Sequence, residues 1–577
     1  MKPIIISLLK NDRLQLWLFT FALILPNIVM AFTEPLPWYT NVMQLLFATG
    51  FFGTLMFCGL QPGRQFYRLF LFVFFAAFQL VLLWLYGNSP ISVDMFLNLV
   101  STNANEAGEL LGNIIAGVII FCTFYIVVLI FAASSWRYYA RHRRDTALDT
   151  RYTAYRHRLR RLFILPLFVT TTAVCTILNF TTPFRFSADV YPINVTFNMG
   201  MAVYRYFQLM RYDSASANFA FNATPTHPAD EQETYVMIIG ETARSLNFSI
   251  YGYERPTTPR LAARQGLHVF RNVLSQSNTT HKSVPLLLTA AEAATPDPMY
   301  TQKSLIAAFR EAGFHTIYIS NQADNGSLTD HYSREAHVRR YVRTPDRMPD
   351  DADLITTLRD ELTADTHTKR LILLHTYGSH FKYCERVPAE YRRFTPCEDK
   401  QLKAANREDL INAFDNTILY ADMVIDSIMT VAGALPADTS RSHSLMVAYV
   451  SDHGEDIYDD ERSNFLHASP IVSFYQMAVP FVIWTNRDYR TAHPSENSML
   501  TCNERAEVSP ARDLFHTMLG AAGIRTTSYT PSHSLTDPQY HPSPRLFLND
   551  RNEPCTLHQL HLTPHDFQLM RKFGITY

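Results

Sequence analysis

Five apolar runs in the first 180 residues constrain the fold more than any other feature of the sequence. A helix needs roughly 20 residues to cross a hydrocarbon core of about 30 Å, and each run is that long or nearly so. The runs cover residues 14–32, 43–60, 69–86, 114–133 and 162–180. The first run follows Lys2, Lys10 and Arg13 as a signal peptide would, but four more runs follow it. We therefore expect an uncleaved, α-helical transmembrane bundle of five spans over residues 1–180.

The charges of the loops predict the orientation of this bundle. Arg64 and Arg68 lie between the second and third runs, and the links at 33–42 and 87–113 contain no Lys or Arg. The link between the fourth and fifth runs carries nine arginines, namely Arg137, Arg141, Arg143, Arg144, Arg151, Arg156, Arg158, Arg160 and Arg161. Basic loops stay in the cytoplasm, so we expect the N-terminus inside and everything after residue 180 outside. An RNA-binding patch is the less favoured interpretation, because this loop lies between two spans.

The overall charge balance excludes one class of function. The chain has 51 basic and 52 acidic side chains, whereas a general nucleic-acid binder needs a large basic excess. The mean hydropathy of −0.06 is an average over an apolar first part and a globular second part. We therefore expect a membrane partner and no nucleic acid.

The cysteines agree with an external second part. Cys384, Cys397, Cys502 and Cys555 form an even set there, and disulfides persist mainly in oxidising compartments. Proximity in the sequence favours the pairs Cys384–Cys397 and Cys502–Cys555, although four cysteines allow three connectivities. No C-x-x-C spacing favours a zinc site made of these cysteines.

Residues 181–233 connect the two parts. The stretch 190–212 mixes aromatic residues with Arg205 and Arg211, which is typical of a helix in the membrane interface. A surface helix of the soluble domain is the alternative. From residue 215 the composition turns polar, with Pro225 and Pro228, and predicts a linker.

From residue 234 to 577, short apolar runs alternate with helical patterns. The candidate strands are 235–239, 315–319, 371–375, 444–450 and 479–484, and the clearest helical stretches are 303–312, 407–431 and 511–522. This alternation predicts a mainly parallel sheet with helices on both faces, an α/β/α domain. The working residues of such sheets gather at the carboxyl ends of the strands.

Several strand ends carry residues that bind metals. Glu241 follows the first candidate strand, Asp452 and His453 follow the strand 444–450, and His380 lies shortly after 371–375. Each alone has an ordinary interpretation, such as a solvated loop acid or a surface histidine beside a helix cap. Thr280 alone would be a helix N-cap. Together, carboxylate oxygens and histidine nitrogens at the ends of one sheet predict a zinc site with an open position for substrate.

These motifs resemble a known family. GETAR stands at 240–244, YGYERPTTP at 251–259, T-H-K-S-V-P at 280–285, LHTYGSH at 374–380 and SDHGED at 451–456. In these motifs the chain resembles the phosphoethanolamine transferases of Gram-negative inner membranes, within the alkaline phosphatase superfamily. The resemblance covers essentially the whole chain and implies five spans followed by a periplasmic, sulfatase-like catalytic domain.

The resemblance also implies roles for individual residues. Thr280 becomes the nucleophile and a zinc ligand, and Glu241, Asp452 and His453 become the other ligands of Zn²⁺. A threonine hydroxyl is a poor nucleophile until a metal or base activates it, which zinc would do here. The implied reaction moves phosphoethanolamine from phosphatidylethanolamine to Thr280 and then to a lipopolysaccharide acceptor, either lipid A or the core.

Five further residues match the family in substrate-binding positions. His380 and His467 match histidines that lie in the same pocket and serve catalysis, substrate binding or a second metal. Asn98, Thr102 and Glu106 match a trio that binds the lipid donor, and their four-residue spacing predicts one face of a helix. Capping in a loop is the alternative for this trio.

Other functions stay open at this point. The nearest is a phosphoglycerol transferase of the same superfamily, and a membrane receptor without catalysis comes from a different class. A sulfatase is disfavoured, because no C-x-P-x-R or S-x-P-x-R run lies near residue 280. The family often carries a Ser-x-x-Lys pair where this chain has Asn321-Gln322-Ala323-Asp324-Asn325-Gly326. The acceptor therefore stays open among lipid A, the inner core of lipopolysaccharide, a periplasmic glucan or another envelope glycan, and a protein. We expect a monomer.

Overall fold

The computed structural model describes residues 7–33, 36–86, 91–101, 104–142, 146–182, 184–344, 347–348, 350–398, 403–434, 442–560 and 562–577. The chain divides into two compact units, which we treat separately. The first consists of Met1–Phe96 and Ala107–Val203 with the short segment Asp460–Asn464. The second consists mainly of Tyr204–Asp459 and Phe465–Tyr577.

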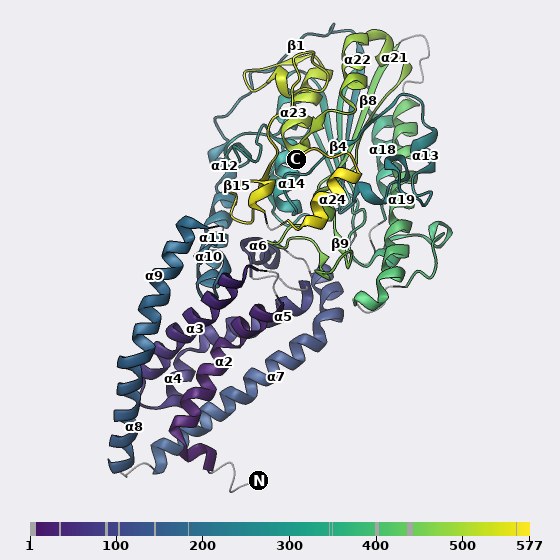
Figure 1. Cartoon of the computed structure of the whole chain (residues 1–577). Coiled ribbons are helices and arrows are strands. Elements are labelled where there is room, and N and C mark those ends of the chain that lie inside the picture. The colour runs from purple at the N-terminus through teal and green to yellow at the C-terminus, as the bar shows by residue number, and fades with distance from the viewer. Residues whose placement is uncertain are drawn as a thin grey trace. The chain divides into compact units, whose positions relative to one another are not determined.

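Helices make up the first unit (Figure 1). In chain order they are α2 (Asp12–Thr33), α3 (Trp38–Cys58), α4 (Pro62–Arg68), α5 (Phe70–Tyr86), α6 (Val93–Ser101), α7 (Ala104–His142), α8 (Thr146–Leu159), α9 (Leu165–Thr181), α10 (Phe186–Asp189) and α11 (Ile193–Met210). The parts of α6 and α7 within Leu97–Glu106, and the part of α11 from Tyr204 onward, belong to the second unit. A π-helical turn at Arg160–Ile164 joins α8 to α9.

Within the described residues, four helical segments are long and apolar enough to cross a membrane. They are Asp12–Thr33, Trp38–Cys58, Gly117–Arg141 and Thr150–Thr181. A fifth arises if α4 and α5 form one span, although their axes are bent by 69°. These segments lie where the five apolar runs were predicted. The helical membrane architecture is therefore confirmed, and the third predicted run belongs to the bent pair of α4 and α5.

The packing of these helices is that of a membrane protein. Large apolar side chains such as Ile130, Phe163 and Phe180 are exposed on α7, on the π-helical turn and on α9, where water would disfavour them. Where α3 meets α9, a Cβ atom added at Gly50 would lie 2.7 Å from the Cα atom of Phe168. Small residues of this kind allow helix backbones to approach closely in lipid.

The predicted interfacial stretch forms a helix, α11, whose side chains are unevenly exposed. Tyr204 and Phe207 are more than half exposed, whereas Arg205 is buried and donates a hydrogen bond to the backbone oxygen of Asp550 at 2.6 Å. The predicted linker also contains structure, because β1 (Thr224–Pro225) pairs with β13 (Ile524–Arg525). The domain boundaries at 180 and 234 stay predictions.

The second unit is built on one seven-stranded sheet with short strands around it (Figure 1). The sheet contains β2 (Gln232–Gly240), β3 (Leu267–Phe270), β5 (His315–Ser320), β6 (Val338–Tyr341), β7 (Lys369–His375), β8 (His443–Ser451) and β11 (Phe481–Thr485). The short strands are β1, β13, β4 (Asn272–Val273), β9 (Asp456–Ile457), β10 (Phe465–Leu466), β12 (Glu507–Val508), β14 (Leu546–Leu548) and β15 (Pro554–Thr556).

The order of strands in the sheet is β3-β11-β8-β2-β7-β5-β6. The strands from β8 to β6 run parallel, as predicted, and β11 runs antiparallel to both of its neighbours. β7 and β8 are buried along their whole length and β2 nearly so, as expected of central strands covered on both faces.

Helices cover both faces of this sheet (Figure 1). The helices of the second unit are α12 (Tyr212–Ala215), α13 (Pro259–Ala263), α14 (Thr280–Leu288), α15 (Pro298–Thr301), α16 (Leu305–Glu311), α17 (Leu328–Ser333), α18 (Ala352–Ala364), α19 (Arg407–Gly433), α20 (Phe474–Met477), α21 (Arg487–Ala492), α22 (Pro494–Asn503), α23 (Pro510–Ala521) and α24 (Pro564–Lys572). Tyr235, Met237 and Ile239 of β2 face the core under α14, α16 and α23. The helices α18 and α19 cover the opposite face, so the predicted α/β/α layering is confirmed.

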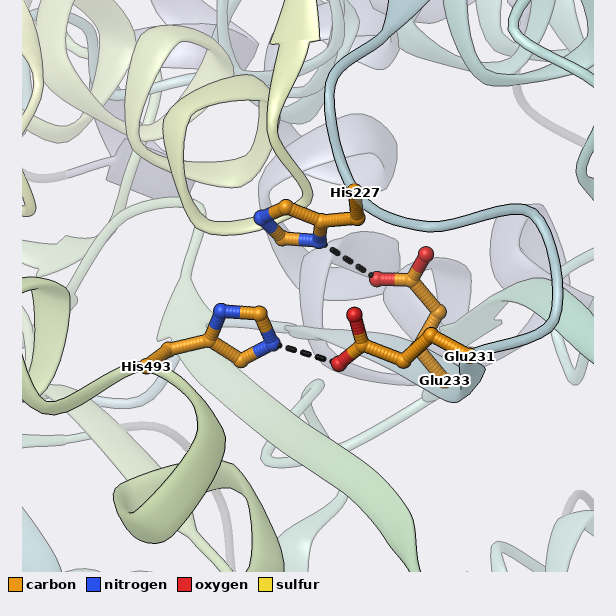
Figure 2. Close-up of side chains that lie close together, drawn as sticks. All are labelled: His227, Glu231, Glu233 and His493. Atoms are coloured by element: carbon orange, nitrogen blue, oxygen red, sulfur yellow. Dashed lines mark hydrogen bonds and ion pairs between the residues drawn. The ribbon is translucent and has the colours of Figure 1, made fainter.

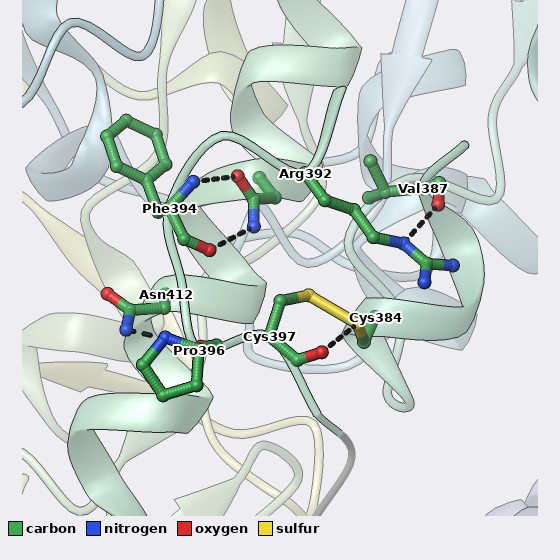
Figure 3. The surroundings of a disulfide bond; sticks show 8 residues. Cys384, Val387, Arg392, Phe394, Pro396, Cys397 and Asn412 are labelled. Atoms are coloured by element: carbon green, nitrogen blue, oxygen red, sulfur yellow. Dashed lines mark hydrogen bonds between the residues drawn. A yellow bond between two sulfur atoms is a disulfide. The ribbon is translucent and has the colours of Figure 1, made fainter. Parts of the chain in front are cut away.

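One of the two proposed disulfides is present. Cys384 and Cys397 are joined, with their Cα atoms 6.0 Å apart (Figure 3). The loop that they close is held to α19 by Asn416, which exchanges two hydrogen bonds of 2.8 Å with the backbone of Phe394.

The second proposed pair is wrong. Cys502 lies exposed in α22 and Cys555 lies in β15, and no disulfide joins them. Proximity in the sequence favoured this pair, but the two residues belong to different elements that do not pair with each other.

Candidate functional site

The parallel strands β2, β7 and β8 end at the same level of the sheet. Gly240 pairs with Ser451, and Ile239 pairs with His375, so the residues that follow these strands emerge side by side. Glu241 comes directly after β2, and Asp452 and His453 come directly after β8. The register of the sheet therefore brings together three side chains that are up to 212 positions apart in the sequence.

These three side chains form a buried cluster. Their carboxylate oxygens and imidazole nitrogens lie within 4.8 Å of one another. His453 Nε2 is 3.3 Å from Asp452 Oδ2 and 3.6 Å from Glu241 Oε1. All three residues are buried, which makes this a compact set of metal-binding atoms shielded from water.

Thr280 presents its hydroxyl to the same cluster. It is the first residue of α14, after the extended residue Thr279. Its Oγ1 atom lies 3.3 Å from each carboxylate oxygen of Glu241 and 3.1 Å from His453 Nε2. The side chain of Thr280 is half-buried, so a substrate from solvent has access to a hydroxyl that touches the cluster.

The orientation of His453 and Asp452 fits a cation. His453 Nδ1 lies 2.9 Å from the backbone oxygen of Gly454, which places the ring proton on Nδ1 and leaves the Nε2 lone pair facing Asp452. Asp452 Oδ1 accepts hydrogen bonds from two backbone N–H groups, those of Thr242 and His453. Asp452 Oδ2 is buried and has no hydrogen-bond partner among the described residues. An acceptor atom and a lone pair therefore face each other, which is the arrangement that a metal ion satisfies.

The electrostatics of the cluster also fit a cation. Burial, and then the charge of Asp452, raises the pKa of Glu241 well above its ordinary value. Burial lowers the pKa of His453 to about 4. A divalent ion would reverse the shift of Glu241, because it favours the ionised carboxylate.

His467 lies against the cluster. Its ring centroid is 4.1 Å from that of His453, and its Nδ1 atom is 3.2 Å from Glu455 Oε1. Burial lowers the pKa of His467 to about 4 and raises that of Glu455 to about 8. His467 is therefore neutral at neutral pH, and its Nδ1 atom contacts Glu455, whose own pKa is about 8.

His380 follows β7 in the turn that approaches Glu241. Burial lowers its pKa well below the ordinary value, and the charges of Arg386 and His467 add to that effect. In the same turn, Gly378 has a φ of +52°, and a Cβ atom there would lie 2.7 Å from the backbone oxygen of Glu241. This close approach positions the turn, and the roles of His380 and His467 stay predictions.

The sequence analysis did not single out Gln322 as a contact of this site. Gln322 Nε2 donates to Glu241 Oε2 at 3.3 Å and to the backbone oxygen of Thr376 at 2.8 Å. The only available signal was its place just after β5, where the family's Ser-x-x-Lys pair is missing. Glu455 was also missed as an individual residue, although it lies in the quoted SDHGED motif.

The predicted lipid-binding trio lies largely outside the described part of the structure. Thr102 is outside the described residues, and so are the side chains of Asn98 and Glu106. Asn98 belongs to α6 and Glu106 to α7. Its role stays a prediction.

Comparison with known proteins gives one family model that matches, described as Sulfatase, over residues 233–524. Among curated proteins, the chain is 31% identical to phosphoethanolamine transferase EptC of Escherichia coli over 336 residues, which is 56% of each protein. It is 30% identical over 318 residues to the Kdo(2)-lipid A phosphoethanolamine 7''-transferase of Salmonella typhimurium, covering 53% of this chain and 54% of that protein. The match therefore spans about half the length of these relatives.

Two solved structures are similar. The first is the C-terminal periplasmic domain of EptC from Escherichia coli in complex with Zn, at 26% identity and a TM-score of 0.54, covering 62% of this chain and 99% of that one. The second is the integral membrane lipooligosaccharide phosphoethanolamine transferase A of Neisseria meningitidis, at 20% identity and a TM-score of 0.69, covering 92% of this chain and 99% of that one. The second likeness concerns the fold alone, and it includes the membrane helices. The relatives confirm the family resemblance stated from the motifs.

The pKa shifts predict how metal binding depends on pH. In the metal-free protein the raised pKa of Glu241 lets this carboxyl hold its proton to a higher pH than an ordinary glutamate does, and His453 is neutral at neutral pH because its pKa is about 4. A metal ion must displace the proton of Glu241, so the affinity for Zn²⁺ should rise by about tenfold per pH unit below the pKa of Glu241. Calorimetric titration of the chelator-treated full chain in buffers of different ionisation enthalpy counts the protons released.

The matched control is Glu241→Gln, which removes the titrating group. Its affinity for Zn²⁺ should be lower and should lose this pH dependence. An affinity of the unsubstituted protein that does not change with pH would contradict the assignment.

Proposed function

Because the chain belongs to the sulfatase family, we propose that its buried cluster catalyses a displacement at a phosphodiester, and that the protein is a membrane-bound phosphoethanolamine transferase. One observation carries this proposal: the Thr280 hydroxyl lies within 3.3 Å of both Glu241 and His453. A hydroxyl at a metal-binding cluster is the arrangement of an activated nucleophile. The names of the curated relatives support the transferred group.

The metal that fits is Zn²⁺. Two carboxylates, one imidazole nitrogen and a hydroxyl oxygen are ligands that zinc accepts, with room left for a substrate oxygen. A bound zinc ion lowers the pKa of the threonine hydroxyl and offsets the negative charge of the phosphoryl group. The zinc complex of the similar periplasmic domain supports this identity.

In the first step, Thr280 Oγ1 attacks the phosphorus atom of phosphatidylethanolamine. The phosphorus–oxygen bond to the diacylglycerol breaks, and its oxygen takes a proton to leave as diacylglycerol. Phosphoethanolamine stays on Thr280, whose proton is lost to solvent. In the second step, an acceptor hydroxyl or phosphate oxygen attacks the same phosphorus atom and Thr280 regains a proton.

His467 is the group that we propose for these proton transfers. It is neutral in the substrate-free protein, and the negative charge of a bound phosphodiester would raise its pKa. Its contact with Glu455 holds the ring in place and provides a second proton site whose pKa is about 8. His380 binds substrate beside it. Asn98, Thr102 and Glu106 bind the donor lipid in this proposal.

The acceptor that we propose is lipopolysaccharide, at lipid A or at the core. The relative from Salmonella typhimurium is named for transfer to Kdo(2)-lipid A, which supports this class. Gln322 lies in the segment where the family's Ser-x-x-Lys pair is absent, and it brings an uncharged amide into contact with Glu241. A phosphoglycerol transferase is the alternative, and the curated relatives do not favour it.

We place the enzyme in the bacterial inner membrane as a monomer. The basic loops favour a cytoplasmic N-terminus and a periplasmic catalytic domain. The Cys384–Cys397 disulfide supports an oxidising compartment for that domain. Membrane spans suit a lipid donor, because phosphatidylethanolamine barely leaves the bilayer.

The nucleophile is tested by intact-mass analysis of the zinc-loaded full chain after incubation with phosphatidylethanolamine. We expect the mass of the unsubstituted protein to rise by one phosphoethanolamine group and that of Thr280→Ala to stay unchanged. The transfer rate of Thr280→Ala should be lower by a factor of roughly 10³ or more. Thr280→Ser, which keeps a hydroxyl, is the matched control. If neither an adduct nor diacylglycerol forms, the donor is wrong. A glycerophosphate adduct from phosphatidylglycerol would favour the alternative.

The proton donor is tested by changing the leaving group. His467→Gln should lower the rate with phosphatidylethanolamine by about 10²–10⁴-fold, because the leaving alkoxide needs a proton. With a nitrophenyl phosphodiester of ethanolamine the loss should be much smaller, since nitrophenolate leaves without protonation. His541→Gln, at an exposed histidine, is the control. Equal losses with both substrates would make His467 a positioning residue.

The acceptor is tested in cells. Transfer of phosphoethanolamine to lipid A or core adds a cationic amine and lowers the negative surface charge. Cells with the gene should therefore survive cationic peptides better than cells without it, and their lipid A or core should carry the group by mass spectrometry. Equal survival and unmodified lipopolysaccharide would count against this acceptor class.

A further inference from the structure

A second cluster of metal-binding side chains lies at the other end of the parallel strands, where β2 begins. Glu233 is the second residue of β2, whereas Glu241 follows its last residue. Eight residues of strand separate the two, which corresponds to roughly 26 Å at about 3.3 Å per residue. The second cluster is therefore far from Thr280 and takes no part in the chemistry proposed above.

Two histidines and two glutamates form this cluster (Figure 2). His227 Nδ1 is 2.9 Å from Glu233 Oε2, and His493 Nε2 is 2.7 Å from Glu231 Oε1. The two imidazole rings stack with their centroids 4.2 Å apart. One ligand atom from each of the four side chains lies within 4.8 Å of the other three.

The surroundings keep one carboxylate ionised and oriented. Glu233 is fully buried, which works to raise its pKa, but hydrogen bonds from His227 and Lys369 hold that pKa below its ordinary value. Lys369 Nζ binds Glu233 Oε1, and Tyr235 Oη donates to Glu233 Oε2 at 2.8 Å. Glu233 Oε2 is thus the oxygen that faces His227 and the centre of the cluster.

The other three side chains of the cluster are mostly buried, and each keeps a small exposed fraction. The side chains of His493, His227 and Glu231 are 8%, 12% and 17% exposed. The cluster is therefore largely shielded from water, and Glu231 is its most exposed member. An arrangement of two imidazoles and two carboxylates around a shielded centre matches the ligand types that zinc prefers.

To hold an ion, the four ligand atoms, which lie within 4.8 Å of one another, would move to tetrahedral separations. Zinc binds histidine nitrogen and carboxylate oxygen at about 2.0–2.2 Å, so neighbouring ligand atoms of a tetrahedral site lie about 3.4 Å apart. The two His–Glu contacts would therefore open by about half an ångström. Each imidazole would give up the proton that it donates to a carboxylate and would carry its single proton on the ring nitrogen that turns away from the ion.

We propose that His227, Glu231, Glu233 and His493 form a structural Zn²⁺ site. His227 and Glu231 lie in the segment before β2, and His493 lies between α21 and α22, 262 positions after Glu231. The ion cross-links the beginning of the α/β unit to a turn near its other end. This role is independent of the transferase reaction.

The proposal is tested by removing two ligands of the catalytic cluster and measuring how much zinc the protein still binds. The full chain carrying Glu241→Gln and Asp452→Asn is stripped with a chelator, reloaded with Zn²⁺, and freed of excess ion by gel filtration. Elemental analysis should find about one zinc ion per chain. Adding His227→Gln and His493→Gln should remove it, whereas adding His541→Gln and His565→Gln, at two exposed histidines, should not.

Thermal unfolding gives a second readout that needs no activity. Zinc should raise the unfolding midpoint of the Glu241→Gln, Asp452→Asn chain, and the rise should disappear when both cluster histidines are replaced. If the histidine variant does not fold, Glu231→Gln alone replaces it and should weaken zinc binding. Absence of zinc from the Glu241→Gln, Asp452→Asn chain, or retention of zinc after the cluster substitutions, would overturn the proposal.

Discussion

Buried negative charge at the carboxyl edge of the sheet is the constraint on which the site depends. The register of β2 and β8 brings Glu241 and Asp452 together where water cannot screen them. Like charges in such a place disfavour ionisation, and the raised pKa of Glu241 is the result. The nearby Arg244 does not relieve this, because its guanidinium pairs with Asp459. The fold therefore places two buried carboxyl groups beside the Thr280 hydroxyl, where a cation would be stabilised, and the metal binding and phosphoryl transfer proposed above both rest on this arrangement.

The two ends of the parallel strands carry similar metal-binding residues, but their carboxylate charges are balanced to different extents. At the amino edge, Lys369 neutralises Glu233, and both glutamates already contact histidines. That cluster is stable without an ion, and an ion would add a cross-link. At the carboxyl edge, Asp452 Oδ2 has no hydrogen-bond partner among the residues that the structure describes. In our proposals, the site with an unpaired buried oxygen serves the reaction, and the site whose four side chains are already paired serves stability.

Much of this arrangement was predictable from the sequence because it depends on local order. A residue that directly follows a buried parallel strand emerges at the carboxyl edge, which is why Glu241, Asp452 and His453 were found. Contacts that depend on how distant elements meet were not predictable. Gln322 reaches Glu241 only because β5 lies two strands away from β2, and His493 meets Glu231 across 262 positions. The Cys502–Cys555 prediction was wrong for the same reason, because a short separation in the sequence does not by itself bring two cysteines together in space.

Gly378 shows how closely the edge of the sheet is fitted together. Its backbone has a left-handed conformation, and it passes so near the Glu241 carbonyl that no side chain fits between them. Any side chain at position 378 would press on the backbone of Glu241, the residue whose carboxylate lies beside the Thr280 hydroxyl. Evolutionary change at this position is therefore restricted by the backbone of a neighbouring turn, although glycine itself has no side chain with which to make a contact.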